Sequence, residues 1–331
     1  MAWRGLCDRV WYGKHPAALC LAPIGYLYEV FVSLRRLAYK SGLFGIHRAA
    51  IPVIVVGNLS TGGTGKTPLV MWLALKLREF GFRPGVIARG YRGVASSWPQ
   101  QVRPDSDPVV VGDEAVLIAK RTGLPVAVGP KRAECIEALQ KYSNVDIIVS
   151  DDGLQHYAMA RDIEIAVLDG VRRFGNGACI PAGPLREPLT RLKQVDLVAT
   201  VGLAGRNEFA IRYTLRSPRF VNDPDRVVSF EDFSSKDVHA VAGIGDPERF
   251  FALLRRNGFQ VTPHPFPDHH SFTPADLEFA DLKPIFMTEK DAVKCVHFHN
   301  ERLWCVPLDV ELPNAFEHRI KTLLKRVFHG Q

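Results

Sequence analysis

Residues 51–68 read IPVIVVGNLSTGGTGKTP, and this stretch constrains the fold of the chain more than any other. A short β-branched run, Pro52–Val56, leads into a glycine-rich loop that ends in Gly-Lys-Thr, and a helix-forming segment follows. A strand, a glycine-rich loop and a helix in this order are the context of a phosphate-binding P-loop. Backbone N–H groups of such a loop point at phosphate oxygens, and the helix N-terminus adds partial positive charge. The segment therefore predicts a nucleotide-phosphate site.

Two side chains of this loop carry the expected chemistry. Lys66 is expected to reach the β- and γ-phosphates, and the Thr67 hydroxyl to bind Mg²⁺. The usual motif has glycine where Ser60 stands, so this is a variant P-loop. A glycine-rich turn with a chance Gly-Lys-Thr is the alternative, and the flanking strand and helix patterns argue against it. The residues expected to contact the nucleotide are Ser60, Thr61, Gly62, Gly63, Thr64, Gly65, Lys66 and Thr67.

Composition sets broad limits on the class of protein. A chain of 331 residues is long enough for two domains, and 47% hydrophobic content is typical of a globular protein. The net charge of +7 suggests an anionic partner such as a nucleotide, an acidic lipid or a nucleic acid, although a mildly basic surface without such a partner is the simpler alternative. The six cysteines lack C-x-x-C spacing, which indicates free thiols in a reducing compartment rather than a disulfide framework or a zinc site.

The N-terminal segment is apolar and has basic flanks. Pro16–Tyr28 carries no charge, but its 13 residues are too few to span a bilayer. Leu27, Phe31, Leu34 and Ala38 then follow at helical spacing, and basic residues precede and end the segment. This pattern suits a helix lying in a membrane interface, and it equally suits an N-terminal helix packed on the protein core. A secretory signal is not expected, because no small-residue cleavage pattern follows a compact apolar run.

Apolar strands alternate with helical patterns from residue 52 to residue 201. Such alternation predicts a parallel sheet with helices on both faces. The expected fold class is α/β, with a P-loop NTPase-type parallel sheet, a smaller C-terminal α/β domain and an N-terminal membrane-interface helix. Strands are expected at 52–56, 85–88, 125–128, 146–149, 163–168 and 196–201, and helices at 68–80 and 131–142.

The alternation breaks in a polar segment that contains Pro218 and Pro224. Proline and polar residues between periodic segments predict a linker. The expected divisions are an N-terminal segment at 1–50, a P-loop core at 51–210, a linker at 211–236 and a smaller α/β domain at 237–331. In that last domain, strands are expected at 238–244, 258–265, 285–288 and 303–307, and helices at 247–256, 274–280 and 314–328.

The run DDGLQH follows an apolar strand that begins at Asp146. The carboxyl ends of parallel strands are where open α/β sheets bind ligands. In P-loop enzymes such a strand places a carboxylate near Mg²⁺, so Asp151 and Asp152 are candidate metal ligands. Gln155 and His156 add an amide and an imidazole to the same turn. Each aspartate alone could equally be a turn or capping residue.

Two further motifs carry charged side chains at predicted turns. Asp113, in Gly-Asp-Glu at a helix start, is either a cap or a general base directed at the γ-phosphate, and the motif alone favours the cap. Arg186 and Glu187 lie in the proline-rich loop PAGPLREP. Prolines stiffen this loop, which would suit a phosphate-binding arginine and a metal-binding glutamate. A rigid connector with a surface ion pair explains the loop equally well.

The last predicted domain contains two more polar motifs. In Pro-Asp-His-His, His269 or His270 could take part in proton transfer, whereas a metal site would need further ligands at suitable spacing. In Thr-Glu-Lys-Asp, Thr288 and Asp291 are interpreted as a helix cap.

Taken together, these motifs resemble a known family. The segments VGNLSTGGTGKTP, ARGYRG, GDEA, DDGLQH, PAGPLREP, FPDHHSF and TEKDAVKC are similar to those of the tetraacyldisaccharide 4'-kinases of lipid A biosynthesis. DDGLQH with PAGPLREP is more specific than the P-loop, and the resemblance covers nearly the whole chain. In this family the first P-loop glycine is also replaced, so Ser60 fits the resemblance.

The resemblance implies an activity and a location. The γ-phosphate of ATP, with Mg²⁺ as cofactor, would go to the 4'-hydroxyl of a lipid-linked glucosamine disaccharide 1-phosphate. The enzyme would be peripheral or monotopic at the cytoplasmic face of the inner membrane, where its lipid substrate is embedded. Neither a nucleic-acid partner nor a required protein partner is expected. The smaller domain would close over the active site.

The resemblance also implies residue roles. Lys66, Asp113 and His269, with His270 less favoured, match catalytic residues; Thr67, Asp151, Asp152 and Glu187 match the metal side; Arg186 matches a phosphate-binding residue; and Gln155 and His156 match the substrate side.

Two other functions are compatible with a P-loop. One is a kinase that acts on a soluble metabolite, which would not need the apolar N-terminus. The other is a nucleotide-dependent switch or metallochaperone, although the sequence lacks the N-K-x-D motif that reads guanine.

Overall fold

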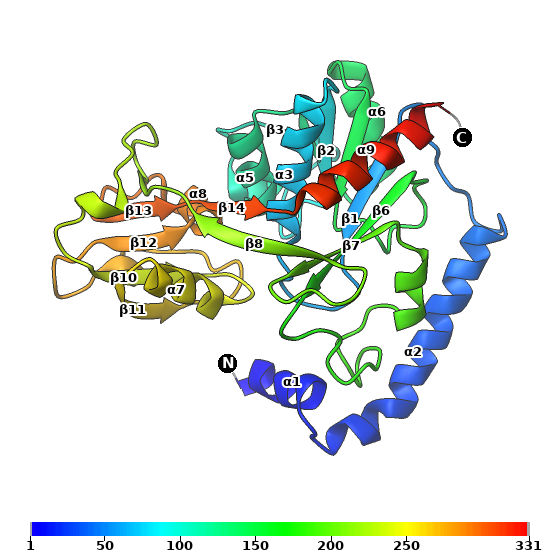
Figure 1. Ribbon diagram of the computed structural model, residues 1–331, viewed down its shortest axis with the longest axis horizontal. Coiled ribbons are helices and arrows are strands. Elements are labelled where there is room, and N and C mark those ends of the chain that lie inside the picture. Colours follow the sequence, from blue (N-terminus) through cyan, green and yellow to red (C-terminus); the bar gives the residue numbers. More distant parts are fainter. Residues whose placement is uncertain (1, 330–331) are drawn as a thin grey trace.

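The computed structural model describes residues 2–329 and contains two sheets flanked by helices (Figure 1). Met1 and residues 330–331, at the outer ends of the expected first and last segments, lie outside the described part. The chain begins with helices α1 (Ala2–Tyr12) and α2 (Ala17–Lys40). It then builds a nine-stranded sheet and a five-stranded sheet.

The larger sheet has the strand order β14-β8-β7-β6-β1-β5-β2-β4-β3. The strands from β8 to β4 in this order run parallel, and only the edge strands β3 and β14 are antiparallel to their neighbours. The predicted α/β class is therefore confirmed. The strands are β1 (Val53–Gly57), β2 (Pro84–Ala88), β3 (Gln100–Val102), β4 (Val126–Val128), β5 (Ile147–Asp151), β6 (Ile163–Asp169), β7 (Leu197–Val201), β8 (Phe209–Leu215) and β14 (Leu308–Glu311).

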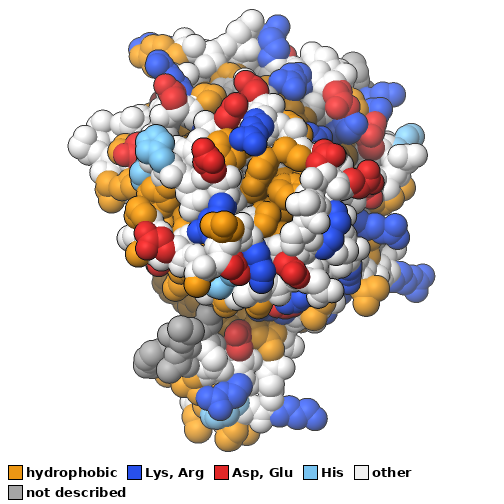
Figure 2. Space-filling view, turned by 90° about the vertical axis from the view of Figure 1, so that its left-hand side faces the viewer, with side chains coloured by type: hydrophobic (Ala, Val, Ile, Leu, Met, Phe, Trp, Pro, Cys, Tyr) orange, Lys and Arg blue, Asp and Glu red, His pale blue; other side chains and the backbone are white. Residues whose placement is uncertain are grey.

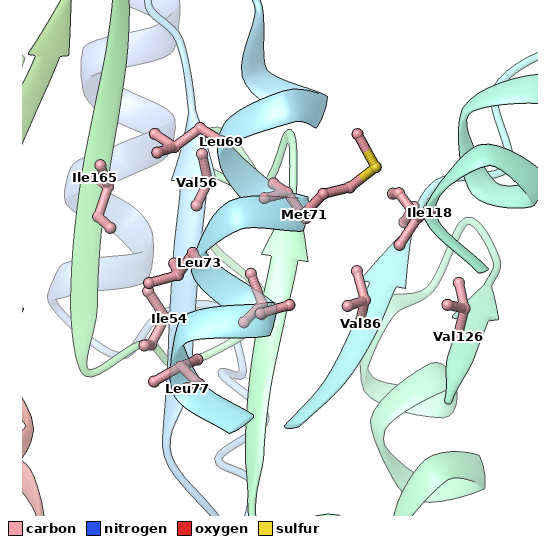
Figure 3. Packing of buried hydrophobic residues seen from close by; sticks show 14 of the residues in the cluster. Ile54, Val56, Leu69, Met71, Leu73, Leu77, Val86, Ile118, Val126 and Ile165 are labelled. Carbon is pink, nitrogen blue, oxygen red and sulfur yellow. The ribbon is translucent and has the colours of Figure 1, made fainter. Parts of the chain in front are cut away.

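Helices cover both faces of this sheet. On one face, Leu69, Leu73 and Leu77 recur along one side of α3 (Lys66–Glu79) and pack with Ile54 of β1 (Figure 3). Each fully buried leucine stabilises the fold by about 1.5–3 kcal/mol. Helices α5 (Asp113–Thr122) and α9 (Asn314–His329) pack on the same face as α3, and the short helix α4 (Pro108–Val111) directly precedes α5 in the chain. Helix α6 (Arg132–Tyr142) packs on the opposite face.

The smaller sheet has the strand order β11-β10-β12-β13-β9, with β9 antiparallel to β13. Phe250 and Phe251 of α7 pack with Phe286 of β12 in its core. A 3₁₀ turn, Pro274–Leu277, stands where a helix was expected at 274–280. The elements are β9 (Arg219–Phe220), β10 (Asp237–Ala242), α7 (Pro247–Arg256), β11 (Gln260–Pro265), β12 (Ile285–Thr288), α8 (Glu289–Cys295) and β13 (Leu303–Val306).

The chain crosses between the two sheets differently from the expected division. Within the expected linker 211–236, the second half of β8 pairs with β14, and β9 joins the smaller sheet. Within 237–331, β14 and α9 return to the larger sheet, where Phe316 and Ile320 of α9 are buried. Residues 211–236 thus contribute strands to both sheets, and most side chains of β8 are half-buried. Figure 1 shows β8 and β14 as a two-stranded ribbon between the sheets.

Helix α2 lies along the outside of the larger sheet (Figure 1). Its inner side contacts the protein, because the Tyr28 hydroxyl donates to the Arg186 carbonyl at 3.2 Å and Gly25 lies against Ala182. Its outer side is apolar and open: Leu27 and Phe31 are 67% and 63% exposed. The helix thus packs on the protein and still presents an unpartnered apolar face.

Helix α2 is longer than the charge-free stretch of 13 residues, which alone is too short to span a bilayer. Its 24 residues include Pro23, and an 18-residue window has a mean hydropathy of 1.7, so by length and composition alone it could cross a membrane. Only 11% of that window is buried in the protein. An apolar helix of this kind is compatible with membrane association.

Candidate active site

A cavity of about 1000 Å³ lies between the two sheets, at the carboxyl ends of the central strands of the larger one. The P-loop, the start of α5 and the turn after β5 line it from the larger sheet, and residues from β10 to α8 line it from the smaller one. Seen from the side of the smaller sheet, acidic and basic side chains are interspersed, so the net positive charge is not gathered on that face (Figure 2). The cavity is the place where the sequence motifs meet.

The P-loop joins β1 to α3 as the sequence predicts. Gly65 has φ +82°, a left-handed conformation that favours glycine, and a Cβ there would lie 1.8 Å from the Tyr213 hydroxyl. Lys66 begins α3, and its ammonium lies 3.2 Å from the Asn58 side-chain oxygen. Thr61 through Thr67 line the cavity, whereas Ser60 is buried in a bridge to residue 185 and is not among the described lining residues.

The two aspartates after β5 occupy different environments. The Thr67 hydroxyl lies 3.2 Å from Asp151 Oδ2, and Asp151 Oδ1 is buried without a hydrogen-bond partner among the described residues. Burial, followed by the nearby Glu114 carboxylate, raises the pKa of Asp151. Asp152 is instead 3.0 Å from the Arg186 guanidinium and 3.6 Å from Lys66.

The cations Lys66 and Arg186 stabilise the charged form of Asp152. Burial works to raise the pKa of Asp152, but Lys66 and Arg186 outweigh it, so the pKa lies below its usual value. Arg186 also lies 3.4 Å from the Gln155 side-chain oxygen. Asp152 therefore joins Lys66 to Arg186, and Arg186 extends these contacts to Gln155.

Glu187 reaches these side chains through Gln155. It is fully buried, and its carboxylate accepts from the Gln155 amide at 2.9 Å and from the Tyr157 hydroxyl. It is not among the described residues that line the cavity. The structure therefore gives Glu187 neighbours that are not those expected for a metal ligand: it orients Gln155, which does line the cavity.

His156 lines the same side of the cavity. Burial, together with the nearby charges of Arg132 and Arg161, lowers the pKa of His156 to about 4. The imidazole is therefore neutral at pH 7 and can donate or accept a hydrogen bond there.

Asp113 meets His269 across the cavity. The Nδ1 atom of His269 lies 3.0 Å from both carboxylate oxygens of Asp113. His269 follows β11 with φ +61°, a strained backbone for a non-glycine residue, and such strain is often found at functional sites. Asp113 is the first residue of α5, with Gly112 as its cap position, and Oδ1 also accepts from the Glu114 N–H at 2.9 Å. Asp113 therefore faces the partner histidine as well as its own helix.

Two lysines complete this cluster. Lys290 Nζ lies 3.2 Å from His269 Nε2 and 2.9 Å from Glu114, and Lys294 Nζ lies 3.9 Å from Asp113. The Lys290 ammonium can only donate, so its contact is with the His269 Nε2 atom as acceptor, while Nδ1 faces Asp113 as donor. Burial works to raise the pKa of Asp113, but the His269 hydrogen bond and the Lys290 charge outweigh it and lower the pKa.

His270, the other candidate histidine, has different partners. Its Nε2 contacts Asp276 at 3.2 Å, and its ring stacks on Phe266. The geometry thus pairs Asp113 with His269 and not with its neighbour.

Some residues of the site were not singled out from the sequence. Thr288 caps α8 by accepting from the Asp291 N–H, as predicted, but Lys290 in the same motif projects into the cavity. Arg132 is buried and donates to the Asp151 carbonyl at 3.3 Å. The signal for both was available: each is a charged residue in the first turn of a helix that follows a buried strand.

Comparisons with known proteins point to one family. The family model described as tetraacyldisaccharide-1-P 4'-kinase matches residues 17–325. A tetraacyldisaccharide 4'-kinase of Nitrosococcus oceani is 53% identical over 98% of this chain and 96% of its own length. One from Methylobacillus flagellatus is 46% identical over 98% of this chain and 97% of its own length.

A solved structure agrees as well. The crystal structure of LpxK from Aquifex aeolicus in complex with ATP superposes with a TM-score of 0.79 at 28% identity, covering 94% of this chain and 99% of that one. Sequence and fold thus agree over nearly the full length, and the chain belongs to the tetraacyldisaccharide-1-phosphate 4'-kinase family.

Proposed function

We propose that this protein transfers the γ-phosphate of ATP to the 4'-hydroxyl of tetraacyldisaccharide 1-phosphate, a step of lipid A biosynthesis. One observation carries the proposal: the paired Asp113 and His269 line the same cavity as the P-loop Lys66. A base opposite a phosphate cradle is the arrangement that phosphoryl transfer to a hydroxyl requires.

Asp113 acts as the proton acceptor in this mechanism. Its lowered pKa keeps the carboxylate charged at neutral pH, so that it can accept the proton of the sugar hydroxyl. His269 donates from Nδ1 to Asp113 and orients it, and Lys290 holds the other side of the imidazole. Because Asp113 and His269 come from different sheets, the pair forms only when the two sheets are close together.

Lys66 and Arg186 supply the positive charge. Phosphoryl transfer needs little covalent chemistry from the protein, and its rate depends on in-line positioning and on neutralised charge. Both cations lie near Asp152, which keeps them directed at the phosphate side of the cavity. Gln155 and His156 line the same cavity, and in this proposal they hydrogen-bond the sugar.

The chain offers a place for Mg²⁺ beside the P-loop. Thr67 and Asp151 would hold the ion, with Asp152 next to them, and the ion would neutralise charge on the phosphates. The buried, unpartnered Oδ1 of Asp151 supports this assignment, because a cation would satisfy it. Among the described residues no group of three or more His, Cys, Asp or Glu could hold a metal alone. Mg²⁺ needs only one or two carboxylates from the protein, because phosphate and water complete its shell.

The enzyme works at the cytoplasmic face of the inner membrane in this proposal. Tyr28 and Arg35 of α2 line the cavity on the inner side of the helix, while Phe31 is exposed on its outer side. A helix placed this way can rest in the lipid interface with the cavity beside it, so that acyl chains of the acceptor stay in the bilayer. At the end of the helix, Arg36 and the exposed Lys40 would meet anionic headgroups.

Phosphate transfer from labelled ATP in mixed micelles tests the proposal. We expect labelled product when the acceptor is tetraacyldisaccharide 1-phosphate, and none when the micelles lack it. Labelled soluble sugars without lipid product would favour a metabolite kinase. Nucleotide binding without transfer to any hydroxyl would favour the switch or metallochaperone alternative.

A further inference from the structure

Besides the contacts around Asp113 and His269, an ion pair on another part of the interface joins the two sheets. Arg249 on α7 lies 2.7 Å from Asp169 Oδ2, at the carboxyl end of β6. Asp169 is 3% exposed, and its other oxygen accepts the N–H groups of Val171 and Arg172 at 2.9 and 3.0 Å. The aspartate is therefore held rigidly by the larger sheet, and the arginine brings α7 to it.

The loop before α7 touches the P-loop itself. A Cβ on Gly245 would lie 2.9 Å from the Gly63 Cα, and a Cβ on Gly63 would lie 3.2 Å from the Gly245 Cα. Only glycine at both positions allows two backbones to approach this closely. Gly245 comes four residues before Arg249, so the ion pair and the close approach belong to one short segment of the smaller sheet.

This segment is rigidly coupled to His269. Helix α7 lies between β10 and β11 in the chain, its Phe250 is fully buried in the small core, and His269 follows β11. The His269 N–H also donates to the carbonyl of Gly243, just after β10, at 3.2 Å. A shift of α7 relative to the P-loop must therefore shift His269 relative to Asp113.

We propose that Arg249 is a positioning residue, whose ion pair with Asp169 fixes the smaller sheet over the P-loop and thereby brings His269 to Asp113. Arg249 also lines the cavity and lies 3.5 Å from Asp246. In this proposal the pair with Asp169 acts on the reaction through His269. A displacement of catalytic groups by about 1 Å can slow a reaction about 100-fold. Loss of this partly buried ion pair can therefore lower turnover by moving His269. The proposal uses the lipid kinase activity as a readout and rests on the proposed function to that extent.

A double-mutant cycle with a matched control tests the ion pair. We expect Arg249→Met and Asp169→Asn each to lower kcat by about 10- to 100-fold, with KM for the lipid changed much less, and the double variant to be no slower than either single one. The side-chain amide that Asp169→Asn introduces keeps an oxygen for the two backbone N–H groups, and Arg249→Lys should recover part of the loss. Arg255→Met removes an ion pair with Glu248 inside α7 and should leave kcat unchanged. Full activity of Arg249→Met, or multiplicative losses in the double variant, would overturn the proposal.

A measurement of the distance between the two sheets tests the positioning role of Arg249 without using catalytic activity. Spin labels on cysteines introduced at the exposed Tyr142 and Leu282 report the spacing of the two sheets once Cys7 and Cys20 are replaced by alanine. With a non-hydrolysable ATP analogue, we expect one narrow distance in the otherwise unchanged protein and a broader, longer distribution in Arg249→Met. Equal distributions would contradict the positioning role of the ion pair. If the unchanged protein does not phosphorylate the lipid, the proposed function fails, and the distances still test that role.

Discussion

His269 Nδ1 lies 3.0 Å from both carboxylate oxygens of Asp113, although the two residues are 156 positions apart in the chain. One stands at the start of α5 beside the larger sheet, and the other follows the edge strand β11 of the smaller sheet. Their contact makes the proton-accepting group depend on the relative position of the two sheets. Domain closure that assembles a catalytic pair in this way also excludes water from the reaction.

The neutral state of His156 predicts a pH dependence of stability. Its folded pKa of about 4 lies below the ordinary value of 6.5, so between these pH values the unfolded chain binds more protons than the folded one. Acidification through this window therefore destabilises the fold. We expect the unfolding midpoint to fall less between pH 7 and pH 4 in His156→Gln than in the unchanged protein. Urea unfolding at several pH values measures the effect, and parallel curves would contradict it.

Glu187 is predicted to contribute to stability and not to metal affinity. Both oxygens of the Glu187 carboxylate accept hydrogen bonds, one from Gln155 and one from Tyr157. Glu187→Gln replaces one of these oxygens with an NH₂ group, which then faces another donor. A buried donor facing a donor costs about 1–3 kcal/mol of unfolding free energy. Denaturant unfolding checks the loss, and a titration of kcat against Mg²⁺ checks the metal. An unchanged free energy of unfolding with a strongly raised Mg²⁺ requirement would restore the metal role expected from the sequence.

The exposed face of α2 is predicted to bind lipid. Leu27→Glu with Phe31→Glu places two charges on a face open to solvent, so vesicle association should fall while the melting temperature stays the same. Leu203→Glu is the control, because Leu203 is 83% exposed and follows β7, outside α2. Co-sedimentation with anionic vesicles is the measurement. Equal losses in the control and the α2 variant would show that charge alone, and not this face, governs association.

Local patterns predicted much of the fold and the site. The strand, loop and helix around Lys66 depend on neighbouring residues only, and so does the turn at Asp151–His156, which is why both could be recognised from sequence. The return of β14 and α9 to the larger sheet could not, since it depends on which core buries Phe316. The direction of the Glu187 side chain could not be predicted either. In a loop, this direction depends on the residues packed around it, and here Tyr157 is one of them.

The central claim is that Asp113 accepts the proton of the sugar hydroxyl. A single-turnover measurement of phosphate transfer by Asp113→Ala, with ATP affinity determined separately, tests this claim most directly. Asp107→Ala is the matched control: Asp107 caps α4 by accepting from the Val109 N–H at 2.8 Å, so its loss should cost about 1 kcal/mol of stability and leave transfer unchanged. We predict that Asp113→Ala slows transfer by about 100- to 10,000-fold while ATP still binds normally. Transfer at a near-normal rate in Asp113→Ala would contradict the claim.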